Sequence, residues 1–218
     1  MRLFLAATLL VASAAHAARP FVTDDARVVE EGGCQIESFV KQQARYNETE
    51  FWFLPACNPF GVELTAGHIH VDSKRNGDSS TTLLQAKTLL KPLVANGSGF
   101  AFSLGVFAGS ENSPYVNGIG SFSFADDRVV IHANLGAIRD NAAKSTRGTW
   151  GLGAEVLLAA PRWYGIVESY GTTGEKPTLH TGLRIWLVPN RLQVDTTLGM
   201  QQNSPDRRFG SIGVRILW

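Results

Sequence analysis

The stretch GSIGVRILW, residues 210–218, alternates between two kinds of side chain. Successive side chains of a β-strand point to opposite faces, so an extended backbone divides this stretch into two sets. One set is Ile212, Val214, Ile216 and Trp218, and the other is Ser211, Gly213, Arg215 and Leu217. The sequence therefore predicts a strand with one face apolar throughout and a charge, Arg215, on the other.

The same alternation recurs from Cys34 onward, in runs of about ten residues bounded by turn-forming residues. Period-2 alternation with β-branched and aromatic content predicts twelve strands, an even number. Their expected ranges are 34–45, 48–57, 61–72, 81–91, 99–109, 116–125, 129–139, 147–160, 163–171, 178–188, 191–201 and 208–218.

The connections between these runs differ in length. Tight links such as NPF (58–60) and VPNR (188–191) follow the even runs, whereas longer polar loops such as DSKRNGDSS (72–80) and RDNAAKSTR (139–147) follow most odd runs. Short turns on one rim and longer loops on the other are typical of outer-membrane barrels, whose short turns face the periplasm. We therefore expect the loop lengths to be sorted between the two rims.

The polar face of the strands separates a membrane barrel from a soluble sheet, which has the same alternation with its apolar face inside. That face holds mostly glycine and small residues with one charged or hydrogen-bonding residue near the middle, which fits a narrow closed lumen. We predict an all-β, transmembrane, up-and-down antiparallel β-barrel of about twelve strands, closed by pairing of the first and last strands. A soluble β-sandwich or lipocalin-like barrel is the alternative.

Aromatic residues mark two places where a membrane interface is expected. Trp218 is predicted at the periplasmic interface, and it resembles the C-terminal assembly signal of outer-membrane barrels. The resemblance implies outer-membrane lipids and the barrel-assembly machinery as partners. The stretch NETEFWFLPAC (47–57) breaks the alternation with three consecutive aromatic residues at 51–53, which are interpreted as an aromatic girdle.

Residues 1–17 carry Arg2, an apolar run at 3–11 and a small-residue site at 15–17, which predict a secretory signal peptide cleaved before Ala18. The run is too short for a membrane-spanning helix, which needs about 20 residues. We expect an N-terminal periplasmic segment at 18–33 and an outer-membrane barrel at 34–218.

The charges of the chain nearly cancel, with 20 Lys+Arg against 19 Asp+Glu. Loss of Arg2 with the signal peptide makes the mature chain neutral. No basic patch indicates nucleic acid as a partner.

Cys34 and Cys57 are the only two cysteines. An even number of cysteines in an exported chain predicts a disulfide. Their midpoint falls within RYNE (45–48), so the two residues are expected across a hairpin that turns near Tyr46-Asn47, with the bond at its base. A metal site needs more ligands, and we expect neither a metal nor a cofactor.

Charged and histidine side chains on the polar face are expected inside the barrel, because a lysine or arginine facing lipid at the midplane costs about 2–4 kcal/mol. The lumen-lining candidates are Glu37, Glu63, Lys87, His132, Glu155, Glu168, Arg184, Asp195 and Arg215. Successive strands carry Arg184, Asp195 and Arg215, so we expect opposite charges to pair across neighbouring strands. The ladder is interpreted as structural, and a solute path with charge selectivity is the alternative.

The stretch GHIHVDSK (67–74) groups four residue types found in hydrolytic sites, namely His68, His70, Asp72 and Ser73. A serine enzyme requires a base within hydrogen-bond reach of its nucleophile. On a strand the two histidines share a face that excludes Ser73, and the chain has no G-x-S-x-G elbow. We therefore expect no catalytic residues, and interpret these residues as the polar start of an extracellular loop.

The stretch RPFVTDDA (19–26), followed by glycine and CQIES (34–38), resembles the start of the Gram-negative outer-membrane proteins of the meta-pathway phenol-degradation type, which are often labelled transporter-like. The likeness is specific over 19–39 and general over the barrel. It implies a twelve-stranded barrel associated with passage of small, often apolar compounds, and it carries over no catalytic residues. Acidic residues are common in that family at the positions of Asp24, Asp25 and Glu37. Asp24 and Asp25 are interpreted as capping a turn, and a plug or entry role is the alternative.

Three functional hypotheses follow. The first is an outer-membrane channel or transporter for small solutes, apolar or aromatic ones included. The second is a barrel hydrolase acting on lipids or esters through His68 or His70. The third is a structural or surface-interaction barrel that acts through loops such as 72–80.

Overall fold

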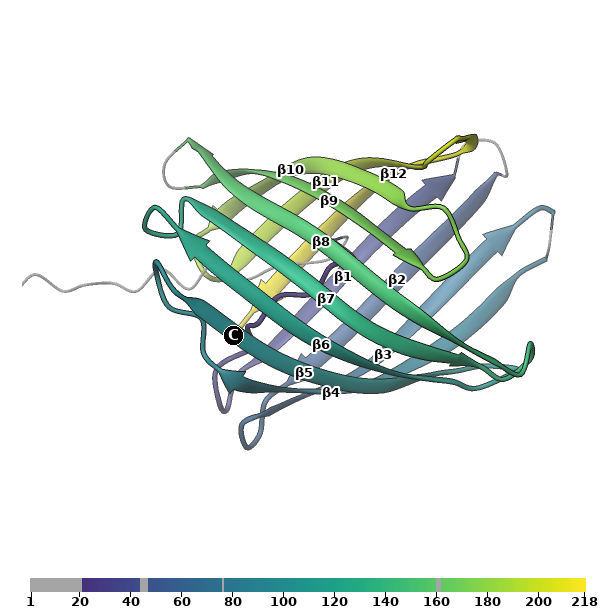
Figure 1. Ribbon diagram of the computed structural model, residues 1–218, viewed down its shortest axis with the longest axis horizontal. Helices are drawn as coiled ribbons and strands as arrows, with labels where there is room; N and C mark the ends of the chain where they lie inside the picture. The colour runs from purple at the N-terminus through teal and green to yellow at the C-terminus, as the bar shows by residue number, and fades with distance from the viewer. Residues whose placement is uncertain (1–20, 44–46, 76, 160–161) are drawn as a thin grey trace, which may run out of the picture.

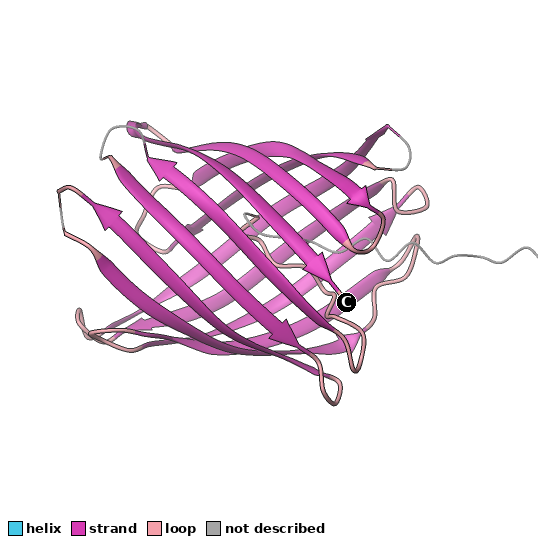
Figure 2. Ribbon diagram, turned by 180° about the vertical axis from the view of Figure 1, so that it is seen from behind, coloured by secondary structure: helices cyan, strands magenta, loops and turns pink. Residues whose placement is uncertain are grey.

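A computed structural model describes residues 21–43, 47–75, 77–159 and 162–218. Every regular element in these residues is a β-strand (Figures 1 and 2). The strands are β1 Cys34–Gln43, β2 Glu48–Cys57, β3 Val62–Ser73, β4 Ser79–Lys91, β5 Ser98–Ala108, β6 Ser113–Phe124, β7 Val129–Asp140, β8 Ser145–Ala159, β9 Trp163–Thr172, β10 Thr178–Val188, β11 Leu192–Gln201 and β12 Ser204–Leu217. Each strand hydrogen-bonds to its sequence neighbours in an antiparallel, closed barrel, so the predicted fold class is confirmed.

Pairing of β1 with β12 closes the barrel, as predicted. Phe39 lies opposite Gly213 in this register. The pairing extends to the end of the chain, because Cys34 N donates to Trp218 O at 2.9 Å and Trp218 N donates to Cys34 O at 3.0 Å. We call the rim that holds these two residues the terminal rim, and the other end of the barrel the opposite rim.

The predicted sorting of loop lengths is wrong. At the opposite rim the connection between β11 and β12 is only 202–203, whereas the connection 92–97 at the terminal rim is longer. The polar stretches read as loops continue instead as paired strands, since β12 begins at Ser204 and β8 at Ser145. Pairing satisfies their backbone groups, and residues with positive φ, such as Lys144 and Asn203, make the tight turns.

The outward face of the wall is apolar. Leu135 and Leu198 are 75% and 69% exposed, and leucine, valine, isoleucine and phenylalanine occupy outward positions on most strands. A soluble protein would bury such a belt, so this surface suits the hydrocarbon core of a bilayer. Within the described residues, no helix has the length and apolar character needed to cross a membrane.

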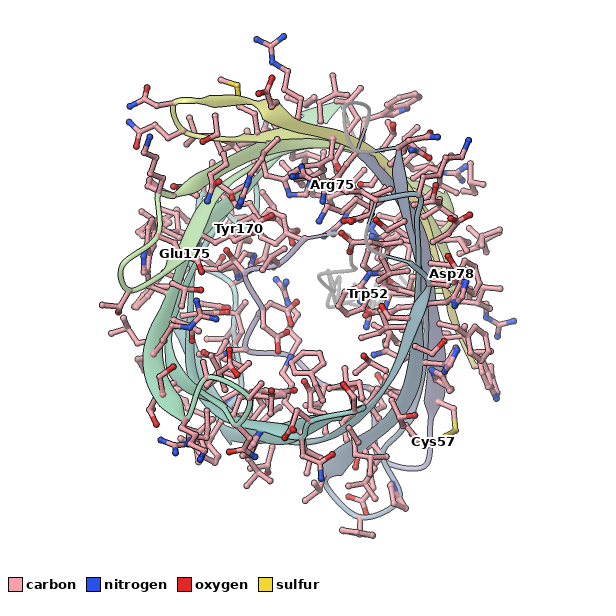
Figure 3. All side chains as sticks on the ribbon, turned by 90° about the vertical axis from the view of Figure 1, so that its right-hand side faces the viewer. Trp52, Cys57, Arg75, Asp78, Tyr170 and Glu175 are labelled. Carbon is pink, nitrogen blue, oxygen red and sulfur yellow. A yellow bond between two sulfur atoms is a disulfide. The ribbon has the colours of Figure 1, made fainter. Side chains whose placement is uncertain are left out.

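The aromatic run of β2 does not form a girdle as a unit. Phe51 and Phe53 are exposed on the outside, but Trp52 points inward and stacks on Phe39 with ring centroids 5.1 Å apart. Figure 3, which looks into the barrel from the opposite rim, shows Trp52 directed to the lumen. The alternation of the strand therefore continues through the three aromatic residues.

The predicted disulfide is present. Cys34 and Cys57 are register partners on β1 and β2, and the sulfur atoms are bonded, with Cα atoms 4.0 Å apart. The sulfur of Cys57 lies on the outer side of the wall (Figure 3). The bond joins the base of the first hairpin at the terminal rim. Of the turn predicted near Tyr46-Asn47, residues 44–46 lie outside the described residues.

Residues 21–29 run inside the barrel, as the purple trace of Figure 1 shows. Phe21, Asp25, Ala26 and Val29 are all buried. Of the segment expected in the periplasm, residues 21–29 thus lie within the lumen and residues 30–33 lie at the terminal rim. We call residues 21–33 the plug. The predicted signal peptide at 1–17 lies outside the described residues.

Candidate functional site

The plug rises from the terminal rim along the inner wall, bound through its backbone. Val29 N donates to Glu63 Oε2 at 2.8 Å, and Asn58 Nδ2 donates to Val29 O at 2.7 Å. Farther in, Ala26 N donates to Ser121 Oγ at 2.8 Å. Side chains of the wall thereby replace the backbone partners that an irregular segment lacks.

The innermost part of the plug is held in the same way. Asp24 N donates to Asn134 Oδ1 at 2.6 Å, and Asn134 Nδ2 returns a bond to Asp24 O at 2.8 Å. Glu168 accepts hydrogen bonds from Thr23 N at 2.7 Å and from Val22 N at 2.9 Å. Backbone N–H groups are strong hydrogen-bond donors to a carboxylate, so the plug satisfies part of the hydrogen-bonding capacity of Glu168.

Ion pairs add to these bonds. Lys87 Nζ lies 2.7 Å from Asp24 Oδ1 and 3.4 Å from Asp25 Oδ1, and Arg27 Nη1 lies 3.3 Å from Asp25 Oδ2. Burial by itself would raise the pKa of Asp25, but the charges of Lys87 and Arg27 outweigh it and hold that pKa well below its usual value. Asp25 caps a local turn, since its Oδ1 accepts a hydrogen bond from Arg27 N at 3.3 Å, and Asp24 and Asp25 also bind the plug to the wall through Lys87.

A second buried cluster lies on β7, β8, β10 and β11. The guanidinium of Arg184 donates to Asp195 through Nε at 3.1 Å and Nη2 at 2.9 Å, and to Glu155 through Nη1 at 2.7 Å. His132 Nε2 lies 3.3 Å from Glu155 Oε1, and Gln193 Nε2 donates to Asp195 Oδ1 at 2.9 Å. Pairing between neighbouring strands thus joins Arg184 and Asp195, which are register partners.

Arg215 pairs toward β1. Its Nε donates to Gln35 Oε1 at 2.7 Å and lies 3.4 Å from Glu37 Oε1. Its register partner on β11 is Gln193, and Asp195 lies opposite Gly213. The predicted pairing of Arg215 with Asp195 is therefore wrong, because the strand stagger places the two residues at different heights in the wall.

All nine lumen-lining candidates are buried, and they fall into groups. Lys87 and Glu63 contact the plug, Glu168 contacts both the plug and His180, and the others form the clusters of Arg184 and Arg215. The full set is Glu37, Glu63, Lys87, His132, Glu155, Glu168, Arg184, Asp195 and Arg215.

Sequence reasoning missed the further polar partners that complete these groups. They are Gln35, Asn58, Ser121, Asn134, His180, Gln193 and Thr197. His180 is an instructive case, because its Nδ1 lies 2.5 Å from Glu168 Oε1 and its Nε2 lies 2.6 Å from Thr197 Oγ1. Most of these residues alternate with lipid-facing residues, so their position on the polar face was the available signal.

Between the plug and the opposite rim the lumen is hollow. A cavity of about 370 Å³ has Phe21 and Thr23 of the plug at its floor. A second cavity, of about 500 Å³, lies at the opposite rim and shares Lys41, Tyr170 and Phe209 with the first. We call the two together the vestibule. It leads from the opposite rim to the plug.

Aromatic side chains line the inner part of the vestibule. They are Phe39, Trp52, Phe107, Tyr115, Tyr170 and Phe209. Lys41 Nζ lies 4.7 Å from the centroid of the Phe209 ring and 2.8 Å from Glu50 Oε1. The hydroxyl of Thr23 is buried against Gly151 of β8, away from the cavity, and has no hydrogen-bond partner among the described residues. Such a cavity offers broad apolar contact together with a few polar groups.

His68 and His70 lie outside the lumen. His68 is exposed on the outward side of β3, and His70 Nδ1 lies 3.1 Å from Ser80 Oγ. No carboxylate hydrogen-bonds to His70 within the described residues, so a triad is incomplete there. The part of the chain that the structure describes also contains no group of three or more His, Cys, Asp or Glu residues arranged to hold a metal.

Known structures of low sequence identity share this fold. The KdgM porin matches with a TM-score of 0.59 at 11% identity, covering 84% of this chain and 98% of the porin. The Acinetobacter baumannii outer membrane protein Omp33 matches with a TM-score of 0.52 at 7% identity, covering 85% and 97%. At such identities the likeness concerns the fold alone, an outer-membrane β-barrel.

Sequence comparison identifies the family. No curated protein is significantly similar to the chain. The model of a family described as "Uncharacterised conserved protein UCP029691" matches residues 5–218. This match spans nearly the whole sequence, and the chain therefore belongs to that family.

Proposed function

We propose that the protein is an outer-membrane channel for small solutes, closed by its plug. The observation that carries the proposal is the vestibule, which opens at one rim and ends on Phe21 and Thr23. A barrel that served only as a scaffold would not need an empty vestibule above the plug. We place the opposite rim outside the cell and the terminal rim in the periplasm, so a solute enters the vestibule from outside.

The lining of the vestibule favours small solutes with an apolar or aromatic body. Stacked and edge contacts with rings such as Trp52 and Phe209 suit flat apolar groups, and a volume of about 370 Å³ suits a small molecule. The likeness of residues 19–39 to the phenol-degradation type supports the same class of solute.

Passage requires the plug to move, because it occupies the lumen below the vestibule. The double variant Asp24→Asn/Asp25→Asn removes both carboxylates that face Lys87 and leaves a buried ammonium without its ion pairs. An unpaired buried charge is costly, so the closed state is disfavoured in this variant. We expect low conductance from the wild-type protein in planar bilayers and at least a tenfold higher open probability from the variant.

Asp72→Asn is the matched control, since Asp72 is an exposed aspartate outside the lumen and plug. It should conduct like the wild type. Liposome uptake of a neutral aromatic solute should follow the same order among the three proteins. If neither the wild type nor the double variant conducts or admits solute, the channel proposal fails.

A hydrolase on the outer surface is the second candidate, and only the contact between His70 and Ser80 favours it. The double variant His70→Ala/Ser80→Ala tests it. Ester or phospholipid hydrolysis by the wild type that disappears in this variant would support an enzyme. Because we assign no chemistry to these residues, we expect no hydrolysis from either protein.

A further inference from the structure

We propose that the inner wall is a peptide-binding site that takes an extended peptide with an aromatic residue, an acidic pair and a following alanine. The plug is its occupant in this structure and is bound as an exchangeable ligand, not as an integral part of the barrel. This inference goes beyond the channel proposal, because peptide binding does not depend on what the barrel conducts.

The first argument is that the wall recognises backbone. Glu63, Ser121, Asn134 and Glu168 accept hydrogen bonds from plug N–H groups, and Asn58 and Asn134 donate to plug carbonyl groups. These contacts come from separate parts of the wall and follow the plug from Val29 to Val22. Hydrogen bonding to main-chain groups is the usual basis of affinity for extended peptides.

Three subsites add selectivity for side chains. Lys87 lies within ion-pair distance of both Asp24 and Asp25. Ala26 is fully buried in a cluster with Ala101 and Ile119, which leaves room for a methyl group only. The spacing of an acidic pair followed directly by alanine is thus read by two adjacent subsites.

The third subsite receives Phe21. Its ring lies edge-on to His132, with centroids 6.1 Å apart, and fills the space where a side chain on Gly153 would stand. Only glycine at this position of β8 admits the ring, so the wall is shaped for an aromatic side chain. The three subsites together define the sequence pattern of the ligand.

The connection between plug and barrel permits exchange. The last two residues of the plug, Gly32, with φ of +83°, and Gly33, lead directly into β1. The wall itself is closed by strand pairing that does not involve residues 21–31. When the plug leaves, Lys87, Glu63 and Glu168 lose the hydrogen-bonding and ionic partners that the plug supplies. A ligand with equivalent N–H and carboxylate groups therefore binds favourably at this wall.

The test uses the full-length chain with Ala26→Phe. The added ring has no room beneath Ala101 and Ile119, so the plug is displaced while the wall keeps its sequence. The probe is a fluorescein-labelled peptide, FVTDDARVVEE, which corresponds to residues 21–31. Binding is followed by fluorescence anisotropy in detergent, and the heat-dependent shift in electrophoretic mobility verifies that the barrel is folded.

We expect the peptide to bind the Ala26→Phe protein at least tenfold more tightly than the wild type, whose own plug competes at high effective concentration. The control peptide FVTDDFRVVEE should bind at least tenfold more weakly than the native peptide, and FVTNNARVVEE should also bind more weakly. Equal binding of the native and control peptides, or no binding of either, overturns the proposal. If the Ala26→Phe protein does not fold, Asp24→Asn/Asp25→Asn replaces it with the same peptides and criteria.

Conductance separates this inference from the channel proposal. Peptide binding to a variant that does not conduct would support the peptide site and refute the channel. Conductance without sequence-dependent peptide binding would support the channel and refute the peptide site. If both hold, the native peptide should close the Ala26→Phe channel and the control peptide should not.

Discussion

Replacing Arg184 with methionine should destabilise the barrel more than any other single change in its charged clusters. Arg184 is 1% exposed, and its guanidinium is the cation shared by Asp195 and Glu155, which are 1% and 2% exposed. Methionine fills much of the arginine volume but leaves two buried carboxylates without their cation. Removing one partner of a buried ion pair costs about 3–5 kcal/mol.

The contacts of the structure place the expected loss near the middle of that range. Two carboxylates lose the cation, but each retains one polar neighbour, since Gln193 still donates to Asp195 and His132 still lies beside Glu155. We expect a loss of about 4 kcal/mol in the free energy of unfolding, which changes the folding equilibrium about a thousandfold. The measurement is urea unfolding from phospholipid vesicles, followed by tryptophan fluorescence and by the mobility shift on heating.

Two further variants make this experiment decisive. Arg208→Met removes an exposed arginine of β12 and should change stability by less than about 0.5 kcal/mol. The triple variant Arg184→Met/Glu155→Gln/Asp195→Asn removes the uncompensated charges and should recover much of the loss, because neutral groups are less costly to bury. A loss below about 1 kcal/mol for Arg184→Met, with no gain in the triple variant, would show that water screens the cluster and that this reasoning is wrong.

Three more outcomes are expected. The double variant Cys34→Ser/Cys57→Ser should lower the free energy of unfolding by about 3 kcal/mol, since the disulfide closes a loop with a sequence separation of 23. An unchanged midpoint of unfolding in denaturant would contradict this. Lowering the pH should leave conductance unchanged down to about pH 4 and raise it progressively below that. An unpaired Asp25 in the open state takes up a proton near the ordinary aspartate pKa of about 3.9, whereas the lowered pKa in the closed state keeps the paired carboxyl charged, so acid favours the open state. Opening already at pH 6 would contradict a role of the Asp25–Lys87 pair in closing the channel. Trp52→Ala should weaken binding of a neutral aromatic probe such as indole about tenfold, measured by competition in the uptake assay. This factor corresponds to about 1.4 kcal/mol for a lost ring contact. Equal affinity of the variant and the wild type for the probe would show that it binds elsewhere.

Prediction from the sequence was most successful where a local pattern has a single geometric meaning. Alternation along a strand determines which side chains share a face, and it placed Arg184 and Leu198 on opposite sides of the wall without any knowledge of neighbours. It failed for connection lengths, because a polar stretch such as 204–208 reads as a loop, although pairing with β11 keeps it in a strand.

The sequence by itself determined the fold class, the closure of β1 on β12 and the pairing of Cys34 with Cys57, because each follows from periodicity or from symmetry about a turn. Only the tertiary structure decided where residues 21–33 lie. That segment has no alternation, and the groups that bind it, from Glu63 to Glu168, are far apart in the chain and meet only when the barrel closes. Strand stagger likewise decided that Arg215 pairs toward Glu37, since counting residues along strands gives the face of a side chain but not its height in the wall.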